Sequence, residues 1–458
     1  MKNLNKYISE TQRQDTFNFI DYPNVYMIED EKKVYMSKKQ NDFFIIKGKF
    51  IDSSTESDWW YNADGSTTTH TYIENVNPTT KEFTIETRPK PTFLRYLFSN
   101  NTALERIDNI YGTENVTHFL NAFSGCTNLI YINLKPFNLQ SAKSVNYMFQ
   151  NCEKLSNINW KYFRITDKCT EMPGLFTGCP FENIKLNAID TSNCTNLQSL
   201  FYNCQNLKSI DLRPLNTSKC EQWSWMFSYC SSLTELDLSP LDTRSAKSMR
   251  ETFAHLTLTE LDVSSLNVSN VTSMVSMFAF DMQLKKIDCS SWDTRSLTGM
   301  AGIFSSCYQC ESINVNGWNT SACTSMSNVF SWCHVLKELD LTSFDFSKTE
   351  TIYNMFYDCL DLETIKFGVM DLKNCSNLDG AFGVCIRLKN VTGTIKNIHE
   401  DLDLSSCPLT HDSIMVFING LAHVDETKIL SIKTTTYNQL TEGDIAIATS
   451  QGWTISAV

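Results

Sequence analysis

The stretch FYNCQNLKSIDLRPLNTSKCEQWSWMF, residues 201–227, decides the fold because its pattern recurs along most of the chain. It begins and ends on phenylalanine, and the same spacing continues in both directions. Phenylalanine stands at positions 98, 123, 149, 176, 201, 227, 253, 278, 304, 330, 356 and 382, at intervals of 25 to 27 residues. We call these residues the anchor phenylalanines. A period of this length indicates a repeat protein, in which each unit stacks on its neighbours.

Each unit contains an apolar pattern that is typical of a β-strand. Leu207, Ile210 and Leu212 follow the anchor at position 201, and the end of this pattern alternates apolar, polar, apolar. Successive side chains point to opposite faces of a strand, so this spacing buries one face. An Asp or Asn comes next, usually followed by Thr or Ser, as at Asn216 and Thr217. These residues favour turns because their side chains bond nearby backbone N–H groups.

The remainder of each unit predicts a short helix. Met274, Met277 and Phe278 show the three-and-four spacing of one helical face. Several units have Gly or Asn two residues after the anchor, and these residues tolerate the left-handed conformation that ends a helix. They are Gly125, Asn151, Gly178 and Asn203. We therefore expect each unit to fold as strand, turn, short helix and turn.

One such unit cannot bury its apolar stripe alone, whereas stacked units share a continuous core. The predicted fold is an α/β repeat solenoid, leucine-rich-repeat-like, with a parallel sheet on one face and an N-terminal β region. Four parts are expected. They are an N-terminal attachment arm with a hairpin (1–45), a β-rich cap (46–96), a solenoid of about 26-residue units (97–407) and a C-terminal helix–strand cap (408–458).

The C-terminal part departs from the repeat period. Strands are expected at 401–406, 429–433 and 453–458. A helix is expected over residues 409–421, with Thr410 or Asp412 near its start. A second helix is expected to open at Thr441, because Thr441 and Asp444 have the spacing of a capping box.

Of the seventeen cysteines, all but Cys407 follow the repeat. Nine lie three residues after an anchor, at positions 126, 152, 179, 204, 230, 307, 333, 359 and 385, and five form a second column at 169, 194, 220, 323 and 375. Reduced cysteine packs as a small apolar residue, so we interpret these columns as ladders of buried free thiols. Disulfides between neighbouring turns, or a metal site at the Cys307–Cys310 pair, are the alternatives; no second such pair accompanies it, so no metal is expected.

Composition excludes several classes of function. Lys plus Arg number 39 against 51 for Asp plus Glu, a net charge of -12, which argues against a nucleic-acid partner. No apolar run approaches the ~20 residues of a membrane span, so no membrane insertion is expected. The seven histidines are scattered, and no hydrolase, zinc-protease or nucleotide-binding motif occurs. We expect a non-enzymatic protein without a cofactor.

Two columns are candidates for ligand binding. The first consists of carboxylates between the last two apolar strand residues, at Asp211, Asp237, Asp262, Asp288 and Asp340. Stacked like charges repel, so neighbouring lysines, backbone donors or a cation should offset them. The column is thus either a solvated structural face or a ligand- or Ca²⁺-binding stripe.

The second candidate is a set of aromatic residues shortly after their anchors, at Tyr202, Tyr229, Tyr308, Trp332 and Tyr357. Turns are usually exposed, and aromatic rings on one edge could stack on sugar rings or anchor a protein partner. The same rings could instead lie over neighbouring units as packing.

The segments SSLTELDLSPLDTRSAKSM (231–249) and VTSMVSMF (271–278) resemble the BspA-type leucine-rich repeat, also described as the Mycoplasma-type lipoprotein repeat. The C-terminal segments LTHDSIMVFINGL (409–421) and LTEGDIAIATSQGWTI (440–455) are similar to endings of such proteins from gut Bacteroidales and their phages. The segment DYPNVYMIEDEKKVYM (21–36) is similar to the openings of phage virion and fibre-like proteins.

The resemblance implies adhesion to host matrix, cells or glycans. Surface members of the family carry a secretion signal or lipobox, which MKNLNKYISETQRQ (1–14) lacks, so we favour a phage virion location. The expected protein is a structural, tail- or head-fibre-like component that contacts a bacterial surface polysaccharide or protein. Its N-terminal region would contact other virion proteins, and a homotrimer would suit a fibre. The alternatives are a BspA-like bacterial cell-surface adhesin and an intracellular protein–protein scaffold.

Overall fold

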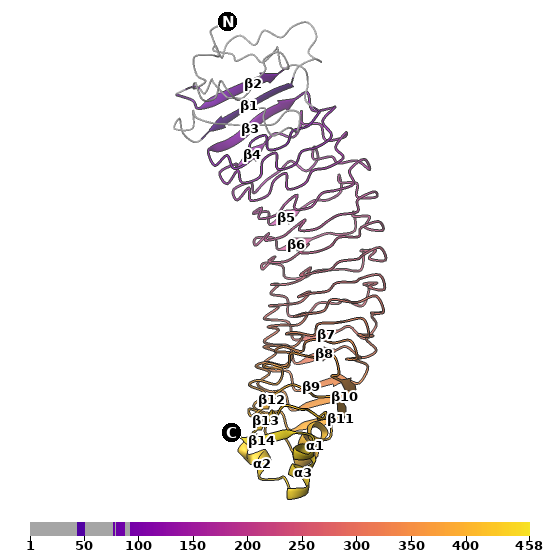
Figure 1. Cartoon of the computed structure of the whole chain (residues 1–458). Coiled ribbons are helices and arrows are strands. Elements are labelled where there is room, and N and C mark those ends of the chain that lie inside the picture. The colour runs from indigo at the N-terminus through magenta and orange to yellow at the C-terminus, as the bar shows by residue number, and fades with distance from the viewer. Residues whose placement is uncertain (1–43, 51–76, 78, 88–91) are drawn as a thin grey trace, which may run out of the picture. The chain divides into compact units, whose positions relative to one another are not determined.

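The computed structural model describes residues 44–50, 77, 79–87 and 92–458 (Figure 1). Most of the expected attachment arm, including its hairpin, lies outside the described residues. The chain forms two compact units, residues 1–216 and 217–458. Each unit is a parallel-strand β-solenoid, and together they contain about 14 turns. The predicted leucine-rich-repeat-like solenoid with parallel strands is therefore confirmed.

The first unit begins with an antiparallel addition to its solenoid sheet. Strand β1 (Phe44–Phe50) pairs antiparallel with both β2 (Glu82–Thr87) and β3 (Leu104–Tyr111). Strand β3 then pairs parallel with β4 (Tyr131–Ile132), which gives the order β2-β1-β3-β4. Strand β1 thus occupies the outer edge of β3, an edge that would otherwise present unpaired backbone groups. A second parallel pair in this unit consists of β5 (Asn183–Ile184) and β6 (Ser209–Ile210).

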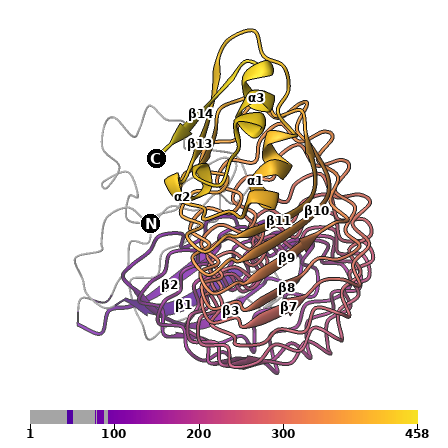
Figure 2. The ribbon, with the colours of Figure 1, turned by 90° about the horizontal axis from the view of Figure 1, so that it is seen from below.

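The second unit has parallel strands in chain order along one face, as Figure 2 shows. They are β7 (Lys286–Asp288), β8 (Ser312–Asn314), β9 (Glu338–Leu341), β10 (Thr364–Asp371) and β11 (Asn390–Lys396). The unit ends in a parallel sheet of β12 (Leu402–Leu404), β13 (Lys428–Ile432) and β14 (Trp453–Ala457). Its helices are α1 (His411–Ile418), α2 (Thr434–Tyr437) and α3 (Glu442–Ser450).

The strands and helices expected in the C-terminal part are confirmed. Thr410 is the N-cap of α1, and its side chain accepts a hydrogen bond from the N–H of Ser413. Thr441 and Asp444 form the expected capping box at the start of α3. Among the described residues, no helix has both the length and the apolar character needed to cross a bilayer.

The prediction of a short helix in each repeat is wrong. Between Met274 and Phe280, alternate N–H groups donate to carbonyls one turn further on, as from Met274 to Gly299 at 2.8 Å and from Phe278 to Ile303 at 2.9 Å. The intervening N–H groups close tight turns to the third preceding residue, as from Met277 to Met274 at 3.1 Å. Residues two before and two after the anchor have positive φ, which an α-helix does not allow. The backbone groups therefore pair between turns of the solenoid.

The anchor phenylalanines form the core. In the second unit, adjacent rings from Phe253 to Phe356 stack with centroids 5.7 to 5.8 Å apart. In the first unit, Phe98, Phe123 and Phe149 stack in the same way, at 5.9 and 5.7 Å. Each ring packs against its neighbours along the axis, so the apolar surface of one unit is buried by the next.

All seventeen cysteines are free and buried, as predicted. In the first column, eight of the nine thiols are seen to donate to the carbonyl of the anchor one turn earlier, as from Cys152 to Phe123 at 3.2 Å and from Cys359 to Phe330 at 3.0 Å. Among the residues that the structure describes, no group of three or more His, Cys, Asp or Glu side chains could hold a metal ion. The thiols therefore act as small core residues that also satisfy anchor carbonyls.

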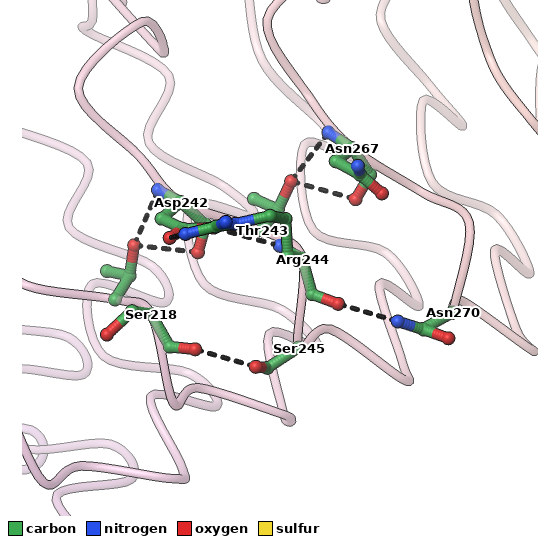
Figure 3. A network of polar contacts seen from close by, with 8 residues as sticks. Ser218, Asp242, Thr243, Arg244, Ser245, Asn267 and Asn270 are labelled. Carbon is green, nitrogen blue, oxygen red and sulfur yellow. Dashed lines mark hydrogen bonds and ion pairs between the residues drawn. The ribbon is translucent and has the colours of Figure 1, made fainter.

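A buried threonine column joins successive turns (Figure 3). The hydroxyl of Thr243 donates to the carbonyl of Asn267 at 2.9 Å and accepts from the N–H of the same residue at 2.8 Å. Close by, Ser245 donates to the carbonyl of Ser218 at 2.6 Å. Thr191, Thr217, Thr294 and Thr320 make the same pair of bonds to the next turn within their units.

Candidate ligand-binding surface

The residue two positions after each anchor, which we call the corner residue, turns the chain sharply. Its φ lies between 54° and 74° in the first unit and between 58° and 64° in the second. In the first unit the corner residues are Asn100, Gly125, Asn151, Gly178 and Asn203. In the second unit they are Tyr229, His255, Phe280, Ser306, Trp332, Asp358 and Val384.

The two units meet the same backbone requirement with different residues. Gly and Asn adopt the left-handed conformation readily, whereas a residue with a bulky side chain is strained there by roughly 1–2 kcal/mol. The first unit uses the favourable residues, and the second places Tyr, Phe, Trp and Val at the same position. Strained residues that persist often mark a functional surface. The corner residues of the second unit are therefore candidates for ligand binding.

Three consecutive corner residues form a stack of nearly parallel rings. The rings of Tyr229 and His255 lie 3.8 Å apart between centroids, and those of His255 and Phe280 lie 4.5 Å apart. Their planes differ by only 13° and 8°, so each ring covers the face of the next. Burial lowers the pKa of His255 below its ordinary value, which keeps the imidazole neutral. The facing sides of these rings are thus covered within this corner stack, whereas Phe280 itself remains 40% exposed.

A second group, which we call the aromatic cluster, has a different geometry. It consists of Tyr308, Trp332, His334 and Tyr357. The ring of Trp332 meets Tyr308 edge-on at 79° and is tilted by 56° from Tyr357, with centroids 6.5 and 5.7 Å away. The ring centroid of His334 lies 4.7 Å from that of Tyr308 and 5.9 Å from that of Trp332. Trp332 remains 40% exposed, so these tilted rings leave aromatic surface open to solvent.

A polar pair borders the aromatic cluster. The Nε2 atom of His334 lies 2.9 Å from Oδ2 of Asp358, the corner residue of the following turn. The side chains are 30% and 14% exposed. Next to them, Arg387 pairs with Asp361 at 2.8 Å. The site combines exposed rings with hydrogen-bonding groups at one edge.

The carboxylates of the predicted column bond within their own turns. Each Asp oxygen accepts the N–H of the residue two positions on, as in Asp262 with Ser264 and Asp288 with Ser290, both at 2.9 Å. Asp211, Asp237 and Asp340 accept the equivalent bond. Side-chain donors lower the pKa of Asp211, Asp288 and Asp340 most, with the backbone N–H groups adding to the effect, whereas the backbone N–H is the main cause at Asp262. Side-chain and backbone donors together thus offset the charge.

The predicted aromatic residues fall into separate places. Tyr308, Trp332 and Tyr357 come together in the aromatic cluster, and Tyr229 belongs to the corner stack. Tyr202 lies in the first unit, where it is half-buried.

Sequence reasoning missed His255, Phe280 and His334. The first two share the corner column with Trp332, and His334 lies four residues after its anchor, as Tyr308 does. Aligning the units by their anchors would have found all three.

These features define the chain as a leucine-rich-repeat-type solenoid with a ligand-binding candidate on one edge of its second unit. It belongs to the family described as "Mycoplasma protein of unknown function, DUF285", whose model matches residues 89–180, 170–287 and 279–393. The resemblance to Mycoplasma-type repeats is thereby confirmed. No curated protein matches the chain.

Solved structures of repeat proteins are also similar. A leucine-rich repeat protein from Bacteroides ovatus ATCC 8483 has 20% identity and a TM-score of 0.35, over 65% of this chain and 80% of that one. One from Eubacterium ventriosum ATCC 27560 has 12% identity and a TM-score of 0.33, over 60% and 75%. The functional domain of InlJ from Listeria monocytogenes, described as including a cysteine ladder, has 14% identity and a TM-score of 0.21, over 73% and 75%.

Proposed function

We propose that this chain is a non-enzymatic adhesion protein that attaches to a bacterial surface polysaccharide or surface protein through its solenoid. The observation that carries the proposal is the placement of large aromatic side chains at the strained corner of the second unit. Such side chains supply contact area at a binding surface with little loss of conformational entropy. Their position contributes little to the core, which the anchors already fill.

The proposed location is a phage virion, where the chain is a structural, fibre-like component. The similarity of residues 21–36 to the openings of virion proteins supports this location. The N-terminal region would then contact other virion proteins. A bacterial adhesin of the BspA type is the second candidate, favoured by the family match over residues 89–393. Immunogold labelling separates the two, because the first predicts label on released phage particles and the second predicts label on intact cells.

Binding of the labelled full-length chain to gut Bacteroidales cells tests the adhesive function. Matched cells with and without capsule should be compared, and excess unlabelled chain should compete. Saturable binding that depends on the capsule would support attachment to surface polysaccharide. Saturable binding that persists without the capsule would support a protein receptor. If no strain shows saturable binding, adhesion is refuted, and a scaffold whose partner is another protein is favoured.

A further inference from the structure

The geometry points to the aromatic cluster, with Asp358, as a binding site for an uncharged pyranose unit of a surface glycan. This inference rests on the proposed adhesive function and makes it specific. It assigns the ligand class and the contact residues, Tyr308, Trp332, His334, Tyr357 and Asp358.

Trp332, like Phe280, has a backbone conformation and an exposure that the fold alone does not explain. Its φ of 63° suits Gly or Asn, the residues that occupy the same corner throughout the described turns of the first unit. The tryptophan is 40% exposed, so the strained backbone does not serve to bury it. A large ring held in an unfavourable backbone conformation and left open to solvent is suited to contact with a ligand.

The orientation of the rings distinguishes the aromatic cluster from the corner stack. In the corner stack, planes within 13° of each other cover one another's faces. In the cluster, the planes around Trp332 are turned by 79° and 56°, so its ring faces are not covered in this way. A pyranose presents an apolar face of C–H groups, which packs on an open aromatic face. The exposed ring of Trp332 can provide that face.

The polar pair supplies what the hydroxyl groups of a sugar require. A carboxylate oxygen accepts several hydrogen bonds, and an imidazole nitrogen donates or accepts one. Asp358 and His334 lie at the edge of the rings, where equatorial hydroxyls would project. An apolar protein side chain would gain nothing from this carboxylate, whereas a sugar hydroxyl can donate to it.

The charges nearby select against acidic sugars. Asp358 and Asp361 both lie at this edge, and the guanidinium of Arg387 is already paired with Asp361. A uronic or sialic acid would place its carboxylate close to that of Asp358, with no unpaired guanidinium from this pair to receive it. An uncharged pyranose avoids the repulsion.

The test uses cells of a strain that the unmodified chain binds. One sample is treated with mild periodate, which cleaves sugars that carry vicinal hydroxyls, and another with protease. We expect periodate to abolish binding and protease to leave it within about twofold. Loss after protease with retention after periodate would overturn the sugar assignment while leaving adhesion intact.

Two glycine variants then locate the site. Trp332→Gly suits the left-handed backbone and removes the central ring of the cluster, so apparent affinity should fall by at least about tenfold. Phe280→Gly makes the same kind of change in the corner stack, and its affinity should stay within about twofold. Asp358→Asn also suits the backbone and should weaken binding.

The pattern of outcomes separates the two proposals. If Trp332→Gly binds as the unmodified chain does, the site lies elsewhere although adhesion stands. If the unmodified chain binds no strain, the proposed function fails and this inference fails with it. Circular dichroism and the urea midpoint of each variant show whether a loss reflects the site or misfolding.

Discussion

Thr243 and Asn267, one turn apart in the solenoid, are joined by two hydrogen bonds through a single hydroxyl group. The hydroxyl accepts the N–H of Asn267 at 2.8 Å and donates to its carbonyl at 2.9 Å. The same connection recurs at other threonines of this column. Backbone groups at the turn after each strand are thus satisfied without a sheet or helix.

Replacing this hydroxyl should destabilise the solenoid. Thr243→Val removes both bonds and leaves an N–H and a carbonyl without these partners, at a cost of about 2–3 kcal/mol. Thr243→Ser keeps the hydroxyl and should cost less, about 1 kcal/mol. Urea denaturation followed by circular dichroism measures the difference. Equal midpoints for the two variants would show that the hydroxyl bonds contribute little.

Asp281 should make stability depend on pH. It occupies the thiol position of its turn, is buried, and accepts the N–H of Leu256 at 2.8 Å. Burial raises its pKa well above the ordinary value; the thiols of Cys307 and Cys310 are the titratable groups that it influences. The folded state therefore holds this proton more tightly than the unfolded state does. Its stabilising effect is complete below about pH 4 and is lost as the pH rises through the raised pKa.

The test replaces Asp281 with the residue found at the same position in most other turns. Asp281→Cys should raise the urea midpoint at pH 8 by more than at pH 5, because the variant has no carboxyl to ionise. We expect a gain of roughly 1–3 kcal/mol at the higher pH. A gain that is independent of pH, or a loss at pH 8, would contradict this account of the buried carboxyl.

The thiol ladders should be unreactive in the folded protein. Burial raises the pKa of Cys194 to about 11 and that of Cys204 to about 12, so hardly any thiolate exists near neutral pH. A chromogenic disulfide reagent at pH 8 should label essentially none of the seventeen thiols until urea is added. Rapid labelling of one thiol in the native protein would show that its turn opens locally.

Corner strain can be tested at a residue that is not part of the proposed site. Val384 has a φ of 60°, which is costly for a β-branched residue, and Asn tolerates this conformation. Val384→Asn should therefore stabilise the chain by about 0.5–1.5 kcal/mol. The matched change Val391→Asn, at a buried strand position, should destabilise it strongly. Destabilisation by Val384→Asn would mean that the left-handed corner carries little strain.

The C-terminal cap contains a histidine with a distinctive titration. Hydrogen bonding to Asp444, at 3.0 Å, raises the pKa of His411, whereas burial lowers that of His255. The N–H of Thr441, and then His411, lower the pKa of Asp444 to about 2. The contribution of His411 is complete below its unfolded pKa, about 6.5, and is lost as the pH rises through the raised value; that of Asp444 is present above about pH 4 and is lost toward pH 2.

Nuclear magnetic resonance can compare the pKa values of the two histidines directly. The Cε1 proton of His411 should titrate at higher pH than that of His255, and Asp444→Asn should lower the pKa of His411. An unchanged His411 pKa in Asp444→Asn would show that the contact does not persist in solution.

The sequence predicts the stacking but not the path of the chain within a turn. Anchor spacing and strand alternation identify the solenoid correctly, because both patterns follow from burial on one face. The three-and-four spacing of Met274, Met277 and Phe278 fits a helix, but consecutive tight turns bury the same residues. Gly and Asn two residues before and after the anchor are the distinguishing signal, since an α-helix cannot contain a positive φ every four residues.

The sequence predicts only part of the candidate site, because the rest depends on contacts between turns. The residues Tyr308, Trp332 and Tyr357 could be selected because aromatic side chains are conspicuous in a turn. The role of His334 depends on its distance from Asp358 on the next turn, which comes from the stacking of units and not from any local motif. The difference between the tilted rings of the aromatic cluster and the parallel rings of the corner stack likewise depends on ring orientations, which only the structure gives.

The aromatic cluster of the second unit is the proposed ligand-binding site. Hydroxyl-radical footprinting of the chain, free and bound to encapsulated cells, tests it most directly. Oxidation of Trp332 and Tyr308 should fall several-fold on binding, whereas that of Tyr111 and Tyr131, exposed in the first unit, should stay unchanged. Protection of Tyr111 and Tyr131 with unaltered oxidation of Trp332 would contradict it.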